Sequence, residues 1–212
     1  MRKIVIYGAG GFGKEIHQLI DIINNRVYTW DLIGFIDDEK LQGSYINGIP
    51  VLGGVEQINL ISENVSVVFA FANPVGMEKL LIKINNNFIN YPNLIHPDVY
   101  FDIKFNEIGI GNIITQGCLF TRNIFIGNFN IFNTRVCVGH DVTIGDLNVF
   151  QPNVQISGNV KIGNKNYWGV NSIVLAFKKI GNSNTIGAAS LLINNITDSS
   201  SYFGVPAMKQ KF

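Results

Sequence analysis

Three histidines occur in the chain, and only one of them is followed by an acidic residue. His140 lies in the run Gly139-His140-Asp141, whereas His17 falls in a helical pattern and His96 precedes a proline. A neutral imidazole accepts a proton near neutral pH, and an adjacent carboxylate fixes its tautomer and stabilises the imidazolium. The pair His140 and Asp141 therefore has the chemistry of a general base, although an outward histidine is more often simply solvated.

A glycine-rich turn near the start of the chain has a different chemical potential. Gly8-Ala9-Gly10-Gly11-Phe12-Gly13 follows an apolar run, and such a turn opens a helix whose N-terminus binds phosphate. Only about 90 residues precede the repeats described below, which is room for half of a dinucleotide fold. We expect a single nucleotide diphosphate here, with a packing turn or a redox cofactor as alternatives. The candidate substrate-binding residues are Gly8, Gly10, Gly11, Phe12, Gly13, Asp37, Asp38 and Asn73.

Composition excludes several classes of protein. Charged residues make up 15% of the 212 residues, the formal net charge is +1, and no basic run suggests a nucleic-acid partner. Cys118 and Cys137 form no metal-binding motif and are expected to be small buried residues. No apolar run is long enough for a signal peptide or a membrane span, so we expect a cytoplasmic protein. The sequence holds 27 Asn and 22 Gly, which disfavours an all-helical fold.

The first part of the chain alternates strands with helices. Apolar strands are expected at residues 3–7, 32–36 and 65–72, and helical spacing follows the glycine turn and recurs at residues 77–84. This order predicts a Rossmann-like parallel sheet over residues 1–92.

The second part, residues 93–212, is a repeat. An Ile-Gly pair recurs every 18 residues, and apolar residues stand at the two intermediate six-residue positions. We read each group of 18 as one triangular coil whose apolar residues point inward. A further register holds Asn112, Asn130, Asn148, Asn166 and Asn184, which are expected to stack as a ladder.

This pattern, from Ile108 to Ile196, resembles the hexapeptide-repeat acyltransferases, whose fold is a left-handed parallel β-helix; the resemblance implies about five coils here. The glycine turn, the run Gly34 to Asp38 and the terminal Gly-Val-Pro-Ala resemble one branch of that family. The branch contains sialic acid O-acetyltransferases and N-acetyltransferases of nucleotide-linked 4-amino sugars.

The resemblance implies an acetyl-CoA-dependent N-acetyltransferase of a nucleotide-linked amino sugar in glycan biosynthesis, without a metal. It implies that His140 is the general base, with Asp141 beside it and the Gly158 N–H as oxyanion donor. Acetyl-CoA is expected in a groove between subunits of a homotrimer, and its implied contacts are Gly158, Val205, Pro206, Ala207 and Lys209. Lys178, Lys179 and Lys211 are further possible phosphate partners.

Three residues depart from the pattern of the branch. Phe12 stands where many relatives have a histidine, Asp141 where many have glutamate, and Met208 separates Pro-Ala from Lys209. The main alternative function is O-acetylation of sialic acid or another sugar hydroxyl. A β-helix carbonic anhydrase needs three histidines at its zinc, and the repeat holds only His140. A non-enzymatic nucleotide-sugar sensor would not need the His140–Asp141 pair.

Overall fold

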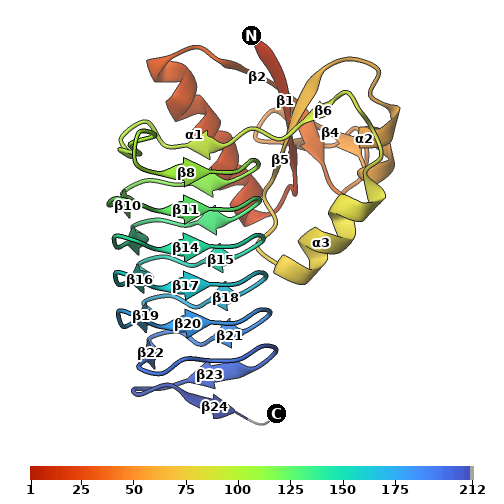
Figure 1. The fold of residues 1–212 in the computed structure, drawn as a ribbon. Helices are drawn as coiled ribbons and strands as arrows, with labels where there is room; N and C mark the ends of the chain where they lie inside the picture. The colour runs from red at the N-terminus through yellow and green to blue at the C-terminus, as the bar shows by residue number, and fades with distance from the viewer. Residues whose placement is uncertain (211–212) are drawn as a thin grey trace. The chain divides into compact units, whose positions relative to one another are not determined.

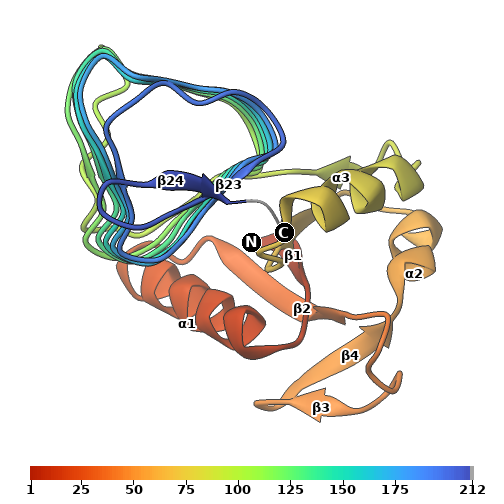
Figure 2. The same ribbon diagram turned by 90° about the horizontal axis from the view of Figure 1, so that it is seen from below.

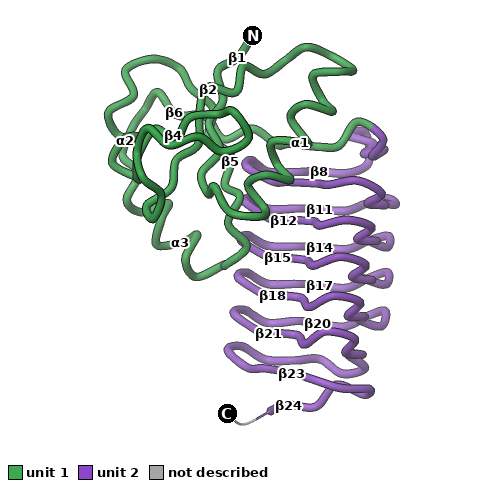
Figure 3. The backbone as a smooth tube through the Cα atoms, turned by 180° about the vertical axis from the view of Figure 1, so that it is seen from behind, with its two compact units in different colours: residues 1–97 green, residues 98–212 purple. Residues whose placement is uncertain are grey.

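The computed structural model describes residues 1–210 and divides the chain into two compact units, residues 1–97 and residues 98–212 (Figure 3). The division falls after Pro97, whereas the sequence suggested residues 92 and 93 as the boundary.

Unit 1 is built on a sheet with the strand order β3-β4-β2-β1-β5-β6, parallel except for the β3–β4 hairpin (Figure 1). Its elements are β1 (Arg2–Tyr7), α1 (Gly11–Arg26), β2 (Trp30–Ile36), β3 (Tyr45–Ile46), β4 (Ile49–Gly53), α2 (Val55–Leu60), β5 (Val65–Phe69), α3 (Pro74–Lys83), β6 (Ile89–Asn90) and β7 (Leu94–Ile95). The predicted strands and helices are present, but β5 ends three residues earlier than expected, at Phe69. The hairpin and α2 were not predicted.

Unit 2 is a left-handed parallel β-solenoid whose two-residue strands stack in three sheets (Figures 1 and 2). One sheet contains β8 (Glu107–Ile108), β11 (Phe125–Ile126), β14 (Thr143–Ile144), β17 (Lys161–Ile162) and β20 (Lys179–Ile180). A second contains β10 (Leu119–Phe120), β13 (Cys137–Val138), β16 (Gln155–Ile156), β19 (Ile173–Val174) and β22 (Leu191–Leu192). The third includes β9 (Ile113–Ile114), β12 (Ile131–Phe132), β15 (Val149–Phe150), β18 (Tyr167–Trp168), β21 (Thr185–Ile186), β23 (Ser201–Phe203) and the antiparallel β24 (Met208–Gln210).

The predicted five coils are too few. Ile196 forms a parallel bridge with Ile180, and β23 pairs with β21, so stacking continues beyond Ile196. Ile196 follows Ile180 by 16 residues instead of 18, and this shorter step hid the continuation from a search at a fixed period. Thr185 and Ile186 of β21 pair with Ser201 and Tyr202, again 16 residues on.

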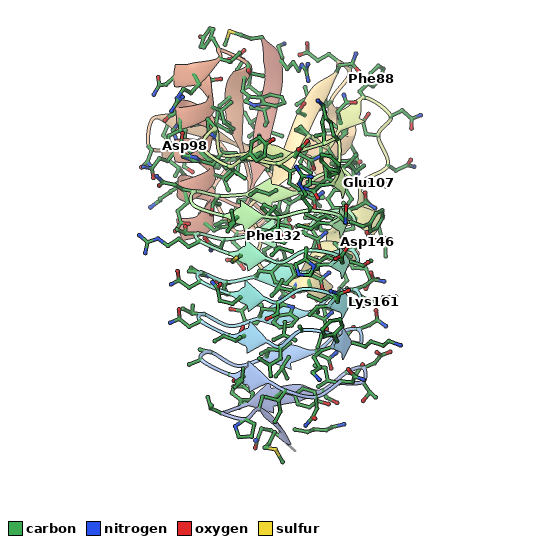
Figure 4. The ribbon with its side chains drawn as sticks, turned by 60° about the vertical axis from the view of Figure 1, so that its left-hand side comes forward. Phe88, Asp98, Glu107, Phe132, Asp146 and Lys161 are labelled. Carbon is green, nitrogen blue, oxygen red and sulfur yellow. The ribbon has the colours of Figure 1, made fainter. Side chains whose placement is uncertain are left out.

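The inward register is as the repeat predicts. All of the predicted inward residues are buried except Ile108, which is half-buried in the first coil. Phe132 stacks on Phe150 with ring centroids 4.9 Å apart, and Phe150 stacks on Trp168 at 5.7 Å. Figure 4 shows Phe132 inside the coils and Lys161 on their outside.

Glycine after the inward isoleucine has a steric reason. A Cβ on Gly145 would lie 2.9 Å from the Gly163 carbonyl oxygen of the next coil. Corner residues every six positions from Asn123 to Ala189 have φ between 54° and 63°, a left-handed conformation that Asn and Asp adopt most easily. This geometry accounts for part of the asparagine content.

The asparagine ladder is buried and fully connected along its middle. Asn148 Oδ1 accepts from the Asn166 backbone N–H at 2.9 Å and from Asn166 Nδ2 at 3.0 Å. Asn148 Nδ2 donates to Asn130 Oδ1 at 3.0 Å and to the Gly163 carbonyl at 2.9 Å. Each rung therefore satisfies backbone groups of the neighbouring coil.

Replacing Asn148 with alanine is expected to lower the free energy of unfolding by about 3 kcal/mol, because buried partners lose their hydrogen bonds. The check is urea denaturation followed by the fluorescence of Trp168, in a Trp30→Phe background that leaves it the sole tryptophan. Asn171→Gly, at an exposed left-handed corner, is the matched control and should change stability far less. Equal effects of the two substitutions would contradict a stabilising ladder.

Candidate functional site

His140 and Asp141 lie at a corner of the solenoid, directly after β13, and their side chains interact. His140 Nδ1 is 2.7 Å from Asp141 Oδ2. The hydrogen bond from His140, together with one from Asn123, holds the pKa of Asp141 below its usual value. An ionised carboxylate only accepts hydrogen bonds, so Nδ1 carries the proton of the neutral ring and Nε2 presents its lone pair. With 62% of the His140 side chain exposed, a substrate can reach it.

Gly158 stacks on the histidine corner from the next coil. A Cβ on Gly158 would lie 2.7 Å from His140 Nε2, so the ring lies directly against this glycine. The Gly158 N–H makes no hydrogen bond within residues 1–210. A Cβ at Gly139 would sit 2.7 Å from this nitrogen, so glycine at position 139 keeps the N–H uncovered. A base and a free donor therefore lie side by side, the pair that acyl transfer needs.

The predicted acetyl-CoA residues of the C-terminal segment are anchored to β22. The Leu191 N–H donates to the Gly204 carbonyl at 3.0 Å, and the Ala207 N–H donates to the Leu191 carbonyl at 2.8 Å. Val205 and Pro206, joined by a cis peptide bond, lie between these contacts. β22 is three strands along the sheet from β13, which is about 14 Å at the usual strand spacing.

Lys209 lies in β24 and lines a hollow of about 370 Å³ with the hydroxyl residues Ser183, Thr185, Ser199, Ser200 and Ser201. Lys211 lies outside the described residues. The structure thus brings Gly158 to His140 and Asp141, and places residues 205–209 several coils away.

Exposed apolar side chains follow the same corner toward the C-terminal segment, and sequence reasoning missed them. Leu175, Phe177, Ile193 and Val205 are at least one-third exposed, and we call these four residues the apolar strip. The Phe177 N–H donates to the Gly158 carbonyl, which fixes the start of the strip next to the histidine corner. A count at six-residue steps that included outward positions would have found Leu175 and Ile193.

In unit 1 the glycine-rich turn borders a pocket of about 440 Å³. Of the predicted residues, Gly8, Gly10, Asp37 and Asp38 line it. The cap residue Gly10 has no side chain to satisfy the first N–H groups of α1, and a Cβ on Gly10 would meet open space. An uncapped helix of this length attracts anions at its N-terminus.

Both predicted aspartates have structural hydrogen bonds as well as a place at the pocket. Asp37 Oδ2 accepts from the Ala9 N–H at 2.8 Å and ties the glycine-rich turn to the end of β2. Asp38 Oδ1 accepts from the Val55 N–H, and Asp38 Oδ2 accepts from the Tyr7 hydroxyl, both at 2.7 Å. Burial, followed by this bond to Asp38, raises the pKa of Tyr7 and keeps the phenol a donor.

Four predicted residues of unit 1 do not line the pocket. Gly11 and half-buried Phe12 lie in the first turn of α1, and Gly13 packs against the Gly8 carbonyl, where a Cβ would collide. Asn73 caps α3, because its Oδ1 accepts from the Gly76 N–H at 3.0 Å.

Three residues that the sequence did not single out do line the pocket. Lys79 and Lys83 lie four residues apart on α3, so they share a face of that helix. Phe71 presents a partly exposed ring to the same pocket. The pocket therefore combines two cations, an uncapped helix N-terminus and an aromatic ring, which suits a nucleotide with its phosphates.

Two further searches covered residues 1–210. They reveal no cluster of three or more His, Cys, Asp or Glu side chains able to hold a metal ion. In the same stretch no helix has the length and apolar character needed to span a membrane.

Comparison with known proteins agrees with both units. The family described as the PglD N-terminal domain matches residues 3–84. A comparison with curated proteins gives no match.

Solved structures match over nearly the full length. WeeI from Acinetobacter baumannii is 26% identical, with 99% of this chain and 100% of that chain covered and a TM-score of 0.86. The acetyltransferase domain of PglB from Neisseria gonorrhoeae, in complex with acetyl coenzyme A, is 25% identical, with 99% of each chain covered and a TM-score of 0.86.

A histidine mutant of perosamine N-acetyltransferase from Caulobacter crescentus, in complex with CoA and GDP-perosamine, is 22% identical and shares the fold. It has a TM-score of 0.90, and the match covers 100% of this chain and 98% of that one. With the matched N-terminal domain, the hexapeptide repeat and these full-length likenesses together, the chain belongs to the hexapeptide-repeat family of sugar acetyltransferases.

Proposed function

We propose that this protein transfers the acetyl group of acetyl-CoA to the amine of a nucleotide-linked amino sugar, with His140 as general base. The observation that carries the proposal is the exposed imidazole, whose Nδ1 is bonded to Asp141 and whose Nε2 lies beside the free Gly158 N–H. PglB bound to acetyl coenzyme A and perosamine N-acetyltransferase bound to CoA and GDP-perosamine support the choice of donor and acceptor.

The mechanism follows from these groups. His140 Nε2 takes a proton from the sugar amine as the amine nitrogen attacks the thioester carbonyl. Asp141 stabilises the imidazolium that forms, and the Gly158 N–H donates to the tetrahedral oxyanion. When the carbon–sulfur bond breaks, the imidazolium returns the proton to the CoA sulfur, leaving the amide and free CoA.

The two substrates have separate candidate sites. The pocket of unit 1 would hold the nucleotide diphosphate, with the helix α1 N-terminus, Lys79 and Lys83 facing its phosphates. Acetyl-CoA would extend along the apolar strip from residues 205–207 to His140, and Lys209 would lie at its phosphate end.

A homotrimer is part of the proposal. Outward residues of the sheet β10-β13-β16-β19-β22 include the exposed Leu119 and Ile173, an apolar surface that a second copy would cover. Sedimentation equilibrium should give three times the 23.5 kDa mass of the chain, and a monomer at assay concentration would contradict the shared acetyl-CoA groove.

The activity is tested by thiol release from acetyl-CoA with UDP-, dTDP- and GDP-linked amino sugars, and with sialic acid. Thiol release with an amino sugar nucleotide and an amide in the product, shown by mass spectrometry and NMR, would support the proposal. Turnover of hydroxyl acceptors alone would establish O-acetylation instead. Absence of release with every acceptor would contradict the proposed class of substrate.

Lys79→Ala is expected to raise KM for the nucleotide sugar roughly tenfold and to leave kcat nearly unchanged, because a charge-assisted phosphate contact is lost. Steady-state kinetics with the active acceptor measure both constants. Lys161→Ala, on the outer face of the solenoid (Figure 4), is the control and should change neither. A fall in kcat at constant KM would mean that Lys79 does not act by binding substrate.

A further inference from the structure

The carboxylate of Asp141 is held from two sides. Its Oδ2 lies 2.7 Å from His140 Nδ1, and its Oδ1 accepts a hydrogen bond from Asn123 Nδ2 at 3.0 Å. Asn123 comes from the preceding coil, 18 residues earlier, and occupies the same corner as Asp141. The three side chains form a chain of hydrogen bonds that runs from one coil to the next and ends at the imidazole.

The backbone makes this arrangement specific. Asn123 and Asp141 both have φ of 58°, and the Asp141 N–H donates to the Arg122 carbonyl at 2.9 Å. Stacked residues with the same backbone conformation point their side chains in the same direction, so the amide of Asn123 meets the carboxylate above it. The next residue in this column, Asn159, also has φ of 58°, but its side chain makes no hydrogen bond to Asp141.

A short carboxylate needs this support. Asp141 reaches a ring on the adjacent residue, and 44% of its side chain is exposed, so solvent competes for both oxygens. A hydrogen bond to Oδ1 removes one of the rotations by which Oδ2 would leave Nδ1.

We propose that Asn123 is a positioning residue of the acetyl transfer reaction, which holds Asp141 so that His140 keeps its proton on Nδ1 and its lone pair on Nε2. This inference rests on the proposed function for its kinetic consequence, but the effect on the tautomer does not depend on any substrate. The hydrogen bond from Asn123 is the second cause, after that from His140, of the lowered pKa of Asp141.

Asn123→Gly is the substitution that separates positioning from folding. Glycine adopts positive φ without strain, so the corner is kept and only the amide is removed. Asn171→Gly is the matched control, because Asn171 has φ of 59° at a different corner and its side chain makes no hydrogen bond within residues 1–210.

The first measurement is the ¹⁵N chemical shifts of the His140 ring nitrogens in the free protein above the titration range, which report the tautomer. Only three histidines occur, so His140→Ala assigns the signals. We expect the Nδ1–H tautomer in the wild type and in Asn171→Gly, and a mixture of both tautomers in Asn123→Gly. Identical shifts in all three proteins would overturn the proposal.

The second measurement is kinetic. In Asn123→Gly, kcat should fall about tenfold while KM for acetyl-CoA and for the acceptor stays within about twofold, because substrate contacts are unchanged. Equal losses in Asn123→Gly and Asn171→Gly, or a change confined to KM, would overturn the positioning role. A tautomer shift in Asn123→Gly together with a wild-type protein that acetylates no amino sugar would refute the proposed function and leave the hydrogen-bond chain intact.

Discussion

Replacing His140 with alanine should lower kcat for acetyl transfer about a thousandfold, within the range that general base catalysis contributes. The reason is that Nε2 is the basic atom beside the Gly158 N–H, and without it the amine must lose its proton to water. KM for both substrates should stay close to the wild-type values, because the ring acts on the transferred proton. Steady-state thiol release measures both constants, and the unfolding temperature checks that the exposed side chain is not needed for folding.

The control for this prediction is His17→Gln. His17 lies in α1 and contacts Phe35, far along the chain from the solenoid corner. Its substitution should leave kcat unchanged. Turnover retained in His140→Ala would remove the general base from the mechanism and with it the proposed role of Asp141.

Gly158→Ala should lower kcat about a hundredfold without unfolding the protein. The new Cβ would lie 2.7 Å from His140 Nε2 and 2.8 Å from Cε1, so the imidazole must turn away from the N–H that faces the oxyanion. The displaced atoms belong to an exposed ring, which can move at small cost to stability. Kinetics and thermal unfolding of the same preparation separate the two effects.

Gly139→Ala gives the opposite pattern and serves as the comparison. Its Cβ would lie 2.7 Å from the Gly158 nitrogen and 2.9 Å from the Ser157 carbonyl carbon, which are backbone atoms of a stacked coil. We expect a loss of about 3 kcal/mol of stability from such overpacking. If Gly158→Ala destabilised the protein as much as Gly139→Ala, the loss of activity would have a structural cause and not the displacement of His140.

Most of the solenoid could be predicted because its rule is local and periodic. Six residues make one side of a coil, so every inward position follows once the Ile-Gly pairs are aligned, from Ile114 to Leu192. The rule failed where the period changed: the step from Ile180 to Ile196 is two residues short, and the coils beyond it were missed. Unit 1 was predicted less completely, since the β3–β4 hairpin and α2 have no such repeat.

The candidate site shows the same difference. His140 and Asp141 are adjacent in sequence, and Gly158 is one period away, so the sequence placed all three at one corner. It assigned Asn73 to the substrate, whereas the Asn73 side chain caps α3. It missed Lys79 and Lys83, because an exposed lysine on a helix has no distinguishing pattern until the pocket beside it is known.

The sequence alone determined the repeat, the direction of each side chain in it and the residues that meet between coils, since a fixed period of 18 makes contacts in space a matter of counting. Only the tertiary structure decided which contacts become hydrogen bonds. Asn123 bonds to Asp141 while Asn159 does not, and the oxygens of Asp37 and Asp38 bind backbone and phenol donors. A period fixes the distance between two backbone positions, but a hydrogen bond also depends on side-chain rotamers and on the competing partners that packing brings near.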